Sequence, residues 1–232
     1  MSTNLRGFNH AVHTLLTNPP QFLPHLTIPT ITSLPEQLGP HLQPDRTKKQ
    51  PTIRALVLDK DNTLCAAKTT RFPSPILAKL AELRTSPTSP FNAGKAPHSI
   101  LIVSNRAGSH PSYENEVAEL EAQLDHLSIP VFRLPAGATK KPFCGQEVIR
   151  WFTERHVIES PDEIAVVGDR LGTDVLMAVQ MGAWSVWCRD GIYDHLNGST
   201  RPGNLLEKME IWIERFFRER GCVAPLPRGF AV

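Results

Sequence analysis

The 232-residue sequence has only four cysteines, few aromatic residues (7%) and almost no net charge (+2). The cysteines are scattered and no CxxC pair occurs, which disfavours a zinc site or a disulfide framework and fits a reducing compartment. No run of about 20 apolar residues exists, so we expect no transmembrane helix. The mild charge gives no indication of a nucleic-acid partner. Hydrophobic residues make up 41% of the chain, which predicts one folded domain with an arm.

Acidic residues are missing from the N-terminal segment, where the first is Glu36, and prolines gather there instead. Proline cannot donate to a helix or sheet ladder, so we expect no regular core structure in this stretch. Apolar residues lie between the prolines, and an apolar extended arm should cover its own domain, a lipid surface or a neighbouring subunit. The last case would make the protein a homo-oligomer. The prolines are Pro19, Pro20, Pro24, Pro29, Pro35, Pro40, Pro44 and Pro51; the apolar residues include Phe22, Leu26, Ile31, Leu34 and Leu38.

The first residues predict an amphipathic helix, with apolar side chains at helical spacing between Leu5 and Leu16. Because it is amphipathic and has no acidic residues, this segment resembles a mitochondrial transit peptide, although only Arg6 is basic. A membrane-surface helix and a helix docked on its own domain are the two other interpretations. We divide the chain into residues 1–51, an extension that docks on a membrane or a partner, and residues 52–232, the main domain.

From Thr52 onward, short apolar runs alternate with helical patterns, which predicts an α/β fold with a parallel sheet. Each run is typical of a strand that is buried on both faces. Ligands of such sheets bind at the carboxyl ends of the strands, so the residues that follow the strands are the first candidates for a site. The predicted strands are 53–58, 99–103, 130–134, 164–167 and 184–188; the predicted helices are 74–84, 113–127, 146–156, 173–181 and 204–220.

The last predicted helix has one apolar and one charged face. We expect the apolar face to pack on the sheet or on a neighbouring subunit, with membrane contact as the alternative. The apolar residues are Leu205, Leu206, Met209, Trp212, Ile213, Phe216 and Phe217; the charged residues expected to face outward are Glu207, Lys208, Glu210, Glu214, Arg215 and Arg218.

Two carboxylates, Asp59 and Asp61, directly follow the first strand of the main domain. In extended chain this spacing points both side chains to the same side. Two like charges there are unfavourable unless a cation lies between them or one group stays protonated. That is the condition for a metal-assisted acid–base pair, and an acidic turn that caps the strand is the alternative.

The second and third strands are followed by groups suited to an anion. Ser104 and Asn105 close the second strand and form a neutral cradle with the turn that follows. After the third strand comes a lysine, Lys140 or Lys141, which can neutralise a phosphoryl oxygen. Each signal is weak by itself, because such residues are common in loops.

The fourth strand ends in Gly168-Asp169, and Asp174 follows in the first turn of the next helix. An aspartate directly after a buried strand suits Mg²⁺, which prefers oxygen ligands. Asp174 can cap its helix and also hold Lys141 or a metal-bound water.

Together, these four strand ends resemble, in order, the four motifs of the haloacid dehalogenase (HAD) superfamily of phosphatases: DxDxT, a terminal Ser or Thr, a Lys, and GDxxxxD. The resemblance covers about residues 53–189. It implies a Rossmann-like sheet, Mg²⁺ as the cofactor and an aspartyl-phosphate intermediate.

By this resemblance Asp59 is the nucleophile, and Asp61 is the general acid and then the base. Mg²⁺ would be held by Asp59, the backbone carbonyl of Asp61, and Asp169. Ser104 and Lys141 would take the remaining phosphoryl oxygens.

The surrounding residues receive supporting roles in the same way. Thr63 and Asn62 would brace the turn after Asp61 rather than touch the substrate. Lys141 is preferred over Lys140 because the family lysine often precedes proline, although sequence alone leaves both open.

The intervals in which HAD enzymes carry cap domains are too short here for the roughly 50 residues that an independent domain needs. We therefore expect a Rossmann-like HAD core without a cap, preceded by the proline-rich extension. The segments DKDNTL, VSNRAG and GDRLGTDVLMA resemble the small IIIA group, which contains the fungal mitochondrial phosphatidylglycerophosphate phosphatases. This implies Mg²⁺-dependent release of phosphate from that lipid, leaving phosphatidylglycerol for cardiolipin biosynthesis, by a peripheral protein on the matrix side of the mitochondrial inner membrane.

Such a substrate also carries an inner phosphodiester, which needs a cation of its own. The basic residues nearest to the strand ends are Lys60, Arg106, His110, Lys140 and Arg170, and our hypothesis is that Arg106 or Lys60 contacts the diester. With Asn105 and Lys140, these two form the predicted substrate-binding set. Arg46, Lys48, Lys49 and Arg54 would add attraction to anionic lipid.

Two other classes of function stay open. The first is a capless phosphatase of soluble small molecules or phosphoproteins, and the second is a catalytically inactive membrane or assembly protein. The complete set of four motifs disfavours the second class. A nucleic-acid 3′-phosphatase has no basic stripe or aromatic platform to support it.

Overall fold

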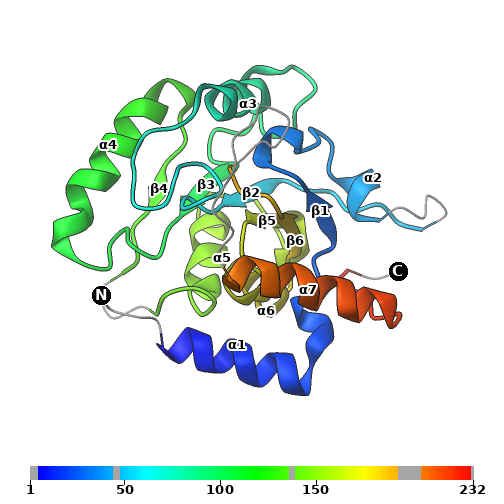
Figure 1. The fold of residues 1–232 in the computed structure, drawn as a ribbon. Coiled ribbons are helices and arrows are strands. Elements are labelled where there is room, and N and C mark those ends of the chain that lie inside the picture. The colour runs from blue at the N-terminus through cyan, green and yellow to red at the C-terminus, as the bar shows by residue number, and fades with distance from the viewer. Residues whose placement is uncertain (1–4, 44–47, 136–138, 193–204, 231–232) are drawn as a thin grey trace.

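The computed structural model describes residues 5–43, 48–135, 139–192 and 205–230 (Figure 1). Six strands form one sheet in the order β1-β6-β5-β2-β3-β4. Every neighbouring pair is parallel, so the predicted Rossmann-like α/β class is confirmed. The strands are β1 (Leu26–Ile28), β2 (Ala55–Leu58), β3 (Ile100–Val103), β4 (Val131–Phe132), β5 (Ile164–Gly168) and β6 (Trp184–Cys188).

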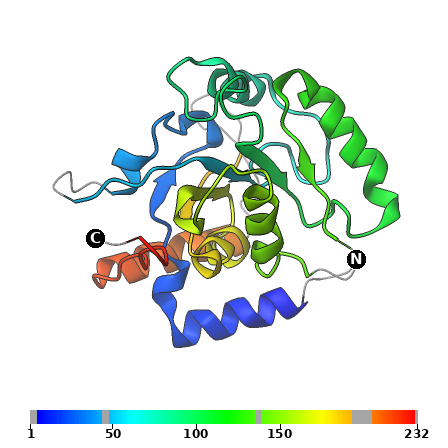
Figure 2. The same ribbon diagram turned by 180° about the vertical axis from the view of Figure 1, so that it is seen from behind.

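Helices cover both faces of the sheet (Figures 1 and 2). α3 (Ser74–Thr85) and α4 (Glu114–Leu124) pack on one face, and α5 (Gly145–Thr153) and α6 (Leu176–Met181) pack on the other. On that second face, α1 (Leu5–Thr17) and α7 (Leu205–Glu219) form an outer layer. The remaining turns are η1 (Pro19–Phe22), η2 (Ile31–Ser33), α2 (Gly39–Leu42), η3 (Pro111–Tyr113), η4 (Asp125–Leu127), η5 (Pro161–Glu163) and the π-helical turn η6 (Leu171–Val175).

The strands and helices predicted from residue 52 onward all occur, with ends that differ by up to three residues. The interior strands β2, β3 and β5 are buried along their whole length, which explains why their sequences are continuous apolar runs. Three residues named in the predictions, Pro44, Arg46 and Asn204, lie outside the described residues.

The expectation that the proline-rich arm holds no regular core structure is wrong. Leu26–Ile28 forms β1, which pairs in parallel with β6 at the edge of the sheet. The nearest prolines, Pro24 and Pro29, flank this strand rather than interrupt it. A three-residue strand at the edge of a sheet forms backbone hydrogen bonds with one neighbouring strand only, so the N–H group that a flanking proline lacks is not required.

The rest of the arm lies on its own domain, one of the three alternatives that the sequence left open. Its apolar side chains enter the same core cluster as the sheet and α3, and Leu34 is only 1% exposed. The members of this cluster from the arm are Ile28, Ile31, Leu34, Leu38 and Leu42. These side chains are therefore not available to a membrane or to another subunit.

The two terminal helices pack differently from the prediction. In α7, Ile213 and Glu210 are buried, whereas Leu205 (82%), Met209 and Trp212 are exposed. Glu210 therefore does not face outward as expected, because it reaches back to η6. In α1, Gly7 and Thr14 face the domain, and Leu5, Phe8, Val12 and Leu16 are exposed. Within the described part of the chain, no helix has the length and hydropathy of a bilayer span.

In the described part of the chain, neither interval in which a cap domain was considered holds one, as predicted. Between β2 and β3 the chain forms α3 and two loops. Between β4 and β5, apart from residues 136–138, it forms only α5 and η5. The carboxyl ends of the central strands thus have no additional domain above them in the described structure.

Leu34→Ala should destabilise the protein by roughly 2–5 kcal/mol, because it opens a cavity in the shared core. Leu16→Ala, at a position 79% exposed in α1, is the matched control and should change stability by less than about 0.5 kcal/mol. Urea unfolding followed by tryptophan fluorescence measures both. Equal effects of the two variants would show that the arm is not part of the core.

Candidate active site

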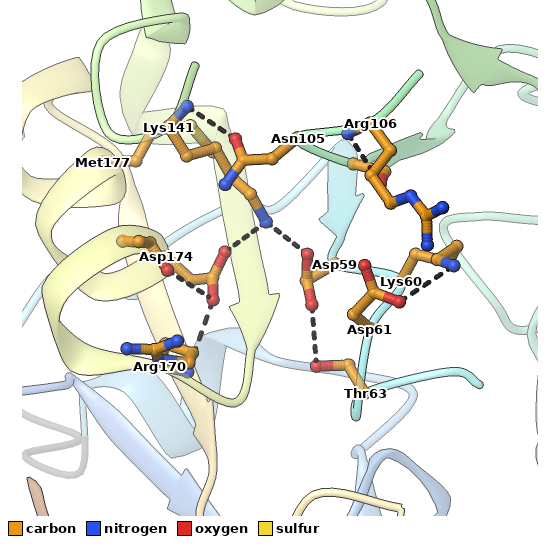
Figure 3. Close-up of polar contacts among 12 residues, drawn as sticks. Asp59, Lys60, Asp61, Thr63, Asn105, Arg106, Lys141, Arg170, Asp174 and Met177 are labelled. Carbon is orange, nitrogen blue, oxygen red and sulfur yellow. Dashed lines mark hydrogen bonds and ion pairs between the residues drawn. The ribbon is translucent and has the colours of Figure 1, made fainter. Parts of the chain in front are cut away.

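Four loops bring the predicted site residues together at the carboxyl edge of the sheet (Figure 3). Asp59 follows β2, Ser104 follows β3 and Asp169 follows β5. Lys141 lies in the loop between β4 and α5. Because all six strands are parallel, their carboxyl ends meet at one edge, which is where a ligand of such a sheet binds.

A buried ammonium group connects the loops. Lys141 Nζ donates to Asp59 Oδ1 and, at 2.6 Å, to Asp174 Oδ1. The Lys141 side chain is only 3% exposed, so these charges interact with little screening by water. The structure therefore places Lys141, and not Lys140, at the centre of the cluster. Burial alone would lower the pKa of Lys141, but Asp174 and Asp59 raise it well above its usual value.

The carboxylates outnumber this one cation. Ligand oxygens of Asp59, Asp169 and Asp174 all lie within 4.8 Å of one another. Burial raises the pKa of Asp59 to about 7, against the opposing charge of Lys141 and with a further increase from Asp174. Burial, together with the charges of Asp59 and Asp174, also raises the pKa of Asp169 well above its usual range. A second cation would relieve this repulsion.

The donor set fits a magnesium ion. Asp169 Oδ2 is buried and has no hydrogen-bond partner among the described residues. Buried polar atoms normally have a partner, so this oxygen is suited to bind a ligand. Both oxygens of Asp174 are instead occupied, Oδ1 by Lys141 and Oδ2 by Arg170 N and Thr173 Oγ1 at 3.3 and 3.2 Å. Asp59 and Asp169 are thus the side chains that could hold Mg²⁺, and Asp174 orients Lys141.

The local sequence explains why Asp174 can reach this position. A Cβ atom on Gly168 would lie 2.4 Å from Asp174 Cγ, so only glycine permits the approach. Asp174 itself lies in the π-helical turn η6, which starts directly after the Asp169-Arg170 loop. Such wide turns are frequent at functional sites.

The residues after Asp59 form a tight turn. Thr63 is fully buried, and its Oγ1 lies 3.5 Å from Asp59 Oδ2, so it braces the turn. Asp61 remains partly exposed beside Asp59 (Figure 3), and its Oδ1 accepts a hydrogen bond from Lys68 N at 2.9 Å. Lys60 Nζ lies 2.8 Å from the same oxygen and donates to Thr69 O at 2.9 Å.

The position of Lys60 does not support the hypothesis that this residue contacts a substrate diester. Its side chain is 2% exposed and its ammonium group is occupied by Asp61 and Thr69. The geometry gives it another role, which is to hold the Asp61 carboxylate beside Asp59.

The loop after β3 supplies groups for an anion. Ser104 is buried, and its Oγ accepts a hydrogen bond from Arg106 N at 3.2 Å. Asn105 Oδ1 accepts from the backbone N–H of Lys141 at 2.8 Å, which ties two site loops together. Arg106 is held by Glu116 at 2.6 Å and lies over the ring of Tyr113. Its Nη1 has no hydrogen-bond partner among the described residues.

The other predicted cations lie outside the cluster. Lys140 forms no ion pair within the part of the chain that the structure describes, and His110 caps η3 through Ser112. Arg54 pairs with Glu163 and Glu159.

Sequence reasoning missed Glu210. It comes from α7, about 40 residues after the last motif, and its Oε1 accepts from Gly172 N at 3.3 Å. Arg170 Nε lies 3.9 Å from the same oxygen. Burial raises the pKa of Glu210 to about 7, although Arg170 opposes this. Its place between Met209 and Ile211 in an apolar helix was the only signal in the sequence.

Comparisons with known proteins show which sequences this chain is similar to. A family model described as mitochondrial PGP phosphatase matches residues 5–193. The chain is 38% identical, over 77% of its length and 83% of the relative's, to phosphatidylglycerophosphatase GEP4, mitochondrial, of Saccharomyces cerevisiae. It is 28% identical, over 98% and 99% of the two chains, to a probable phosphatidylglycerophosphatase, mitochondrial, of Schizosaccharomyces pombe.

A solved structure of D,D-heptose 1,7-bisphosphate phosphatase from B. bronchiseptica, complexed with magnesium and phosphate, is also similar. It has 15% sequence identity and a TM-score of 0.38, over 71% of this chain and 99% of that chain. A similarity this distant says nothing about the chemistry of the present site.

Mg²⁺ should raise the unfolding midpoint more at pH 8 than at pH 6. The pKa values of Asp59 and Asp169 are raised in the metal-free protein, so protons compete with the metal below about pH 7. Because these two pKa values are raised in the folded state, Asp59 and Asp169 hold their protons to a higher pH than in the unfolded chain, and their contribution to the stability of the metal-free protein falls as the pH rises from about 4 to 7. At pH 8 we expect saturating Mg²⁺ to raise the midpoint by roughly 5–10 °C, measured by differential scanning fluorimetry.

Two isosteric variants control this measurement. Asp169→Asn should lose most of the Mg²⁺-dependent increase, whereas Asp125→Asn, which removes an exposed carboxylate in η4, should keep it. An undiminished increase in Asp169→Asn would contradict the assignment of the metal site.

Proposed function

The chain belongs to the mitochondrial PGP phosphatase family, and from this premise we propose that it hydrolyses phosphatidylglycerophosphate to phosphatidylglycerol and phosphate through an aspartyl-phosphate intermediate. It is a phosphatase with a HAD-like core. The observation that carries the proposal is the buried cluster in which Lys141 holds the carboxylate of Asp59 at the carboxyl edge of the sheet. The same reaction would supply phosphatidylglycerol to cardiolipin biosynthesis.

In the first chemical step, a carboxylate oxygen of Asp59 attacks phosphorus and the glycerol oxygen leaves. This divides one difficult hydrolysis into two easier displacements. Lys141 fixes Asp59 Oδ1, and Thr63 lies next to Oδ2. The carboxylate thus cannot rotate freely, which preorganises the attack.

Asp61 is the group that we propose moves the proton. It gives a proton to the leaving glycerol oxygen and then removes one from the water that attacks the aspartyl phosphate. Lys60 and the backbone N–H of Lys68 both hold Oδ1 of Asp61. This anchors the side chain while it remains partly exposed, as a group that meets both the leaving oxygen and water must be.

The substrate phosphate is an anion that enters a cluster rich in carboxylates. Two unit charges about 4 Å apart repel by roughly 4 kcal/mol at an effective dielectric of 20, which corresponds to about three decades in rate. Mg²⁺ bound by Asp59, Asp169 and the backbone carbonyl of Asp61 would offset this charge and polarise a phosphoryl oxygen. Ser104 and Lys141 bind the remaining phosphoryl oxygens, and Asn105 keeps the Lys141 loop in place.

The names of the relatives support a mitochondrial location. We propose that this protein binds peripherally to the matrix side of the inner membrane, where an anionic phospholipid would be its substrate. The surface that fits a lipid interface is formed by the exposed apolar side chains of α1 and α7, two helices that lie near each other (Figures 1 and 2). This set comprises Leu5, Phe8, Val12, Leu16, Leu205, Met209, Ile211 and Trp212.

Asp59→Asn should abolish phosphate release from phosphatidylglycerophosphate, with a loss of at least about three orders of magnitude in kcat, because a neutral amide cannot attack phosphorus. Its unfolding midpoint should stay near that of the wild type. Asp125→Asn is the control for lost charge and should retain activity. Turnover by Asp59→Asn at a near-wild-type rate would overturn the mechanism, and a wild type that prefers sugar phosphates would overturn the substrate.

Membrane contact is tested with point variants, because removal of the arm would remove part of the core. Leu16→Ser combined with Trp212→Ser should reduce flotation with cardiolipin-containing liposomes by severalfold, since both side chains are exposed and apolar. Val223→Ser, also at an exposed position but outside both helices, is the control. Flotation that is equal in all three proteins would exclude α1 and α7 as the membrane-binding surface.

A further inference from the structure

A cavity of about 380 Å³ lies between α1 and α7, next to the catalytic cluster. We call it the α1–α7 groove. Its polar end is formed by Asn105, Arg170, Gly172, Thr173 and Glu210. The rest of its lining is apolar and comprises Leu5, Gly7, Phe8, Ala11, Val12, Leu15, Phe22, Leu206, Met209 and Ile213.

The polar end of the groove belongs to the loops that build the catalytic cluster. Asn105 accepts a hydrogen bond from the backbone N–H of Lys141. Arg170 N and Thr173 Oγ1 donate to Asp174. The groove is therefore lined both by residues of the loops that hold Lys141 and Asp174 and by the two helices.

Two polar atoms that line the groove lack hydrogen bonds to the described residues. Arg170 Nε and Glu210 Oε2 are buried atoms without a hydrogen-bond partner among the described residues. Glu210 is only 5% exposed, and its separation from Arg170, 3.9 Å, is too long for a hydrogen bond. Buried polar atoms are normally satisfied, so the two groups point to a ligand with both acceptor and hydroxyl functions.

We propose that the α1–α7 groove binds the non-reacting part of the lipid substrate, with its phosphodiester at Arg170 and the first part of an acyl chain between α1 and α7. The proposal rests on the function proposed above. A molecule that carries a phosphomonoester at one end and hydrocarbon at the other needs a site that changes from polar to apolar along its length. Binding of these remote parts would position the reacting phosphate at Asp59.

Arg170 suits the diester better than the two cations favoured by the sequence. Lys60 is buried against Asp61, and Arg106 is held by Glu116 and does not line the groove. Arg170 lines the groove and is 41% exposed. Its guanidinium group can bind a phosphate with directed hydrogen bonds.

An acyl chain fits the groove better than a second copy of this protein. The apolar lining continues outward into the exposed side chains Leu5 and Phe8, so hydrocarbon could enter from a lipid interface without crossing water. An apolar surface from another subunit would cover the same side chains but would leave Arg170 Nε and Glu210 Oε2 without partners.

Ala11→Phe tests the groove, because Ala11 is half-buried in its lining and a larger side chain would fill it. The matched control is Ala118→Phe on the exposed face of α4. In detergent micelles, Ala11→Phe should raise KM for dioleoyl phosphatidylglycerophosphate at least about tenfold, or about 1.4 kcal/mol. Its KM for the deacylated headgroup and for p-nitrophenyl phosphate should change less than about twofold.

Equal losses on the acylated and deacylated substrates, or no loss on either, would overturn the groove as the acyl site. Val12→Trp, at the more exposed rim, repeats the test if Ala11→Phe does not fold. An altered oligomeric state with unchanged lipid kinetics would assign the groove to a second copy instead. The variants add apolar surface, so a helix that only docks on membranes would bind more tightly and lose no activity.

Arg170→Ala, compared with Arg106→Ala, tests the diester contact. Arg170→Ala should raise KM for the deacylated headgroup, which retains the diester, at least about tenfold, and KM for p-nitrophenyl phosphate about twofold or less. A diester-selective effect of Arg106→Ala alone would move the diester to Arg106 and overturn the assignment to Arg170.

A binding measurement separates this proposal from the proposed function. Phosphatidylglycerol with a photoactivatable acyl chain should label peptides of α1 and α7 in the Asp59→Asn protein, and Ala11→Phe added to it should abolish the labelling. Labelling elsewhere, in a protein that does hydrolyse phosphatidylglycerophosphate, would overturn the groove and leave the function. Labelling of α1 and α7 in a protein that does not hydrolyse this lipid would support the groove and overturn the proposed function.

Discussion

The site depends on the ion pairs that the buried ammonium group of Lys141 forms with Asp59 and Asp174. This ammonium group neutralises part of the charge of Asp59, Asp169 and Asp174, whose oxygens lie within 4.8 Å of one another. Burial raises the pKa values of Asp59 and Asp169, and the neighbouring carboxylates, which one cation cannot balance, raise them further. We propose that the remaining imbalance is offset by Mg²⁺, and that the site then accepts the phosphate of a substrate.

The fold keeps these charged side chains close together, and its hydrophobic core includes residues from outside the segment that carries the motifs. The sheet gathers the loops at one edge, and the proline-rich arm adds both the outer strand β1 and part of the core. α1 and α7 then lie against η6, the turn that carries Asp174. The catalytic cluster and the apolar face that we propose for lipid are thus built on neighbouring elements, without a cap domain between the site and the substrate's surroundings.

Much of this could be predicted from the sequence, because the motif residues follow buried strands and parallel strands end at one edge. That reasoning led to Asp59, Ser104, Lys141, Asp169 and Asp174, which the structure places together. It failed where position depends on contacts between distant segments. β1 is a strand only because β6 offers it a partner, and Glu210 is buried only because α7 lies on η6. Lys60 turns inward because of local contacts instead, since Asp61 and Thr69 O, both within nine residues, occupy its ammonium group.

The central claim is that Asp59, held by Lys141, becomes phosphorylated during turnover. The most direct measurement is mass spectrometry of peptides from enzyme that is quenched in acid during turnover of phosphatidylglycerophosphate with Mg²⁺. Asp61→Asn lacks both the acid of the first step and the base of the second, so it should gain the phosphoryl group more slowly and also lose it more slowly. We predict one phosphoryl group on the peptide that contains Asp59, and none when Mg²⁺ is omitted. Turnover with no phosphorylated peptide, or with the phosphoryl group on another residue, would contradict this account.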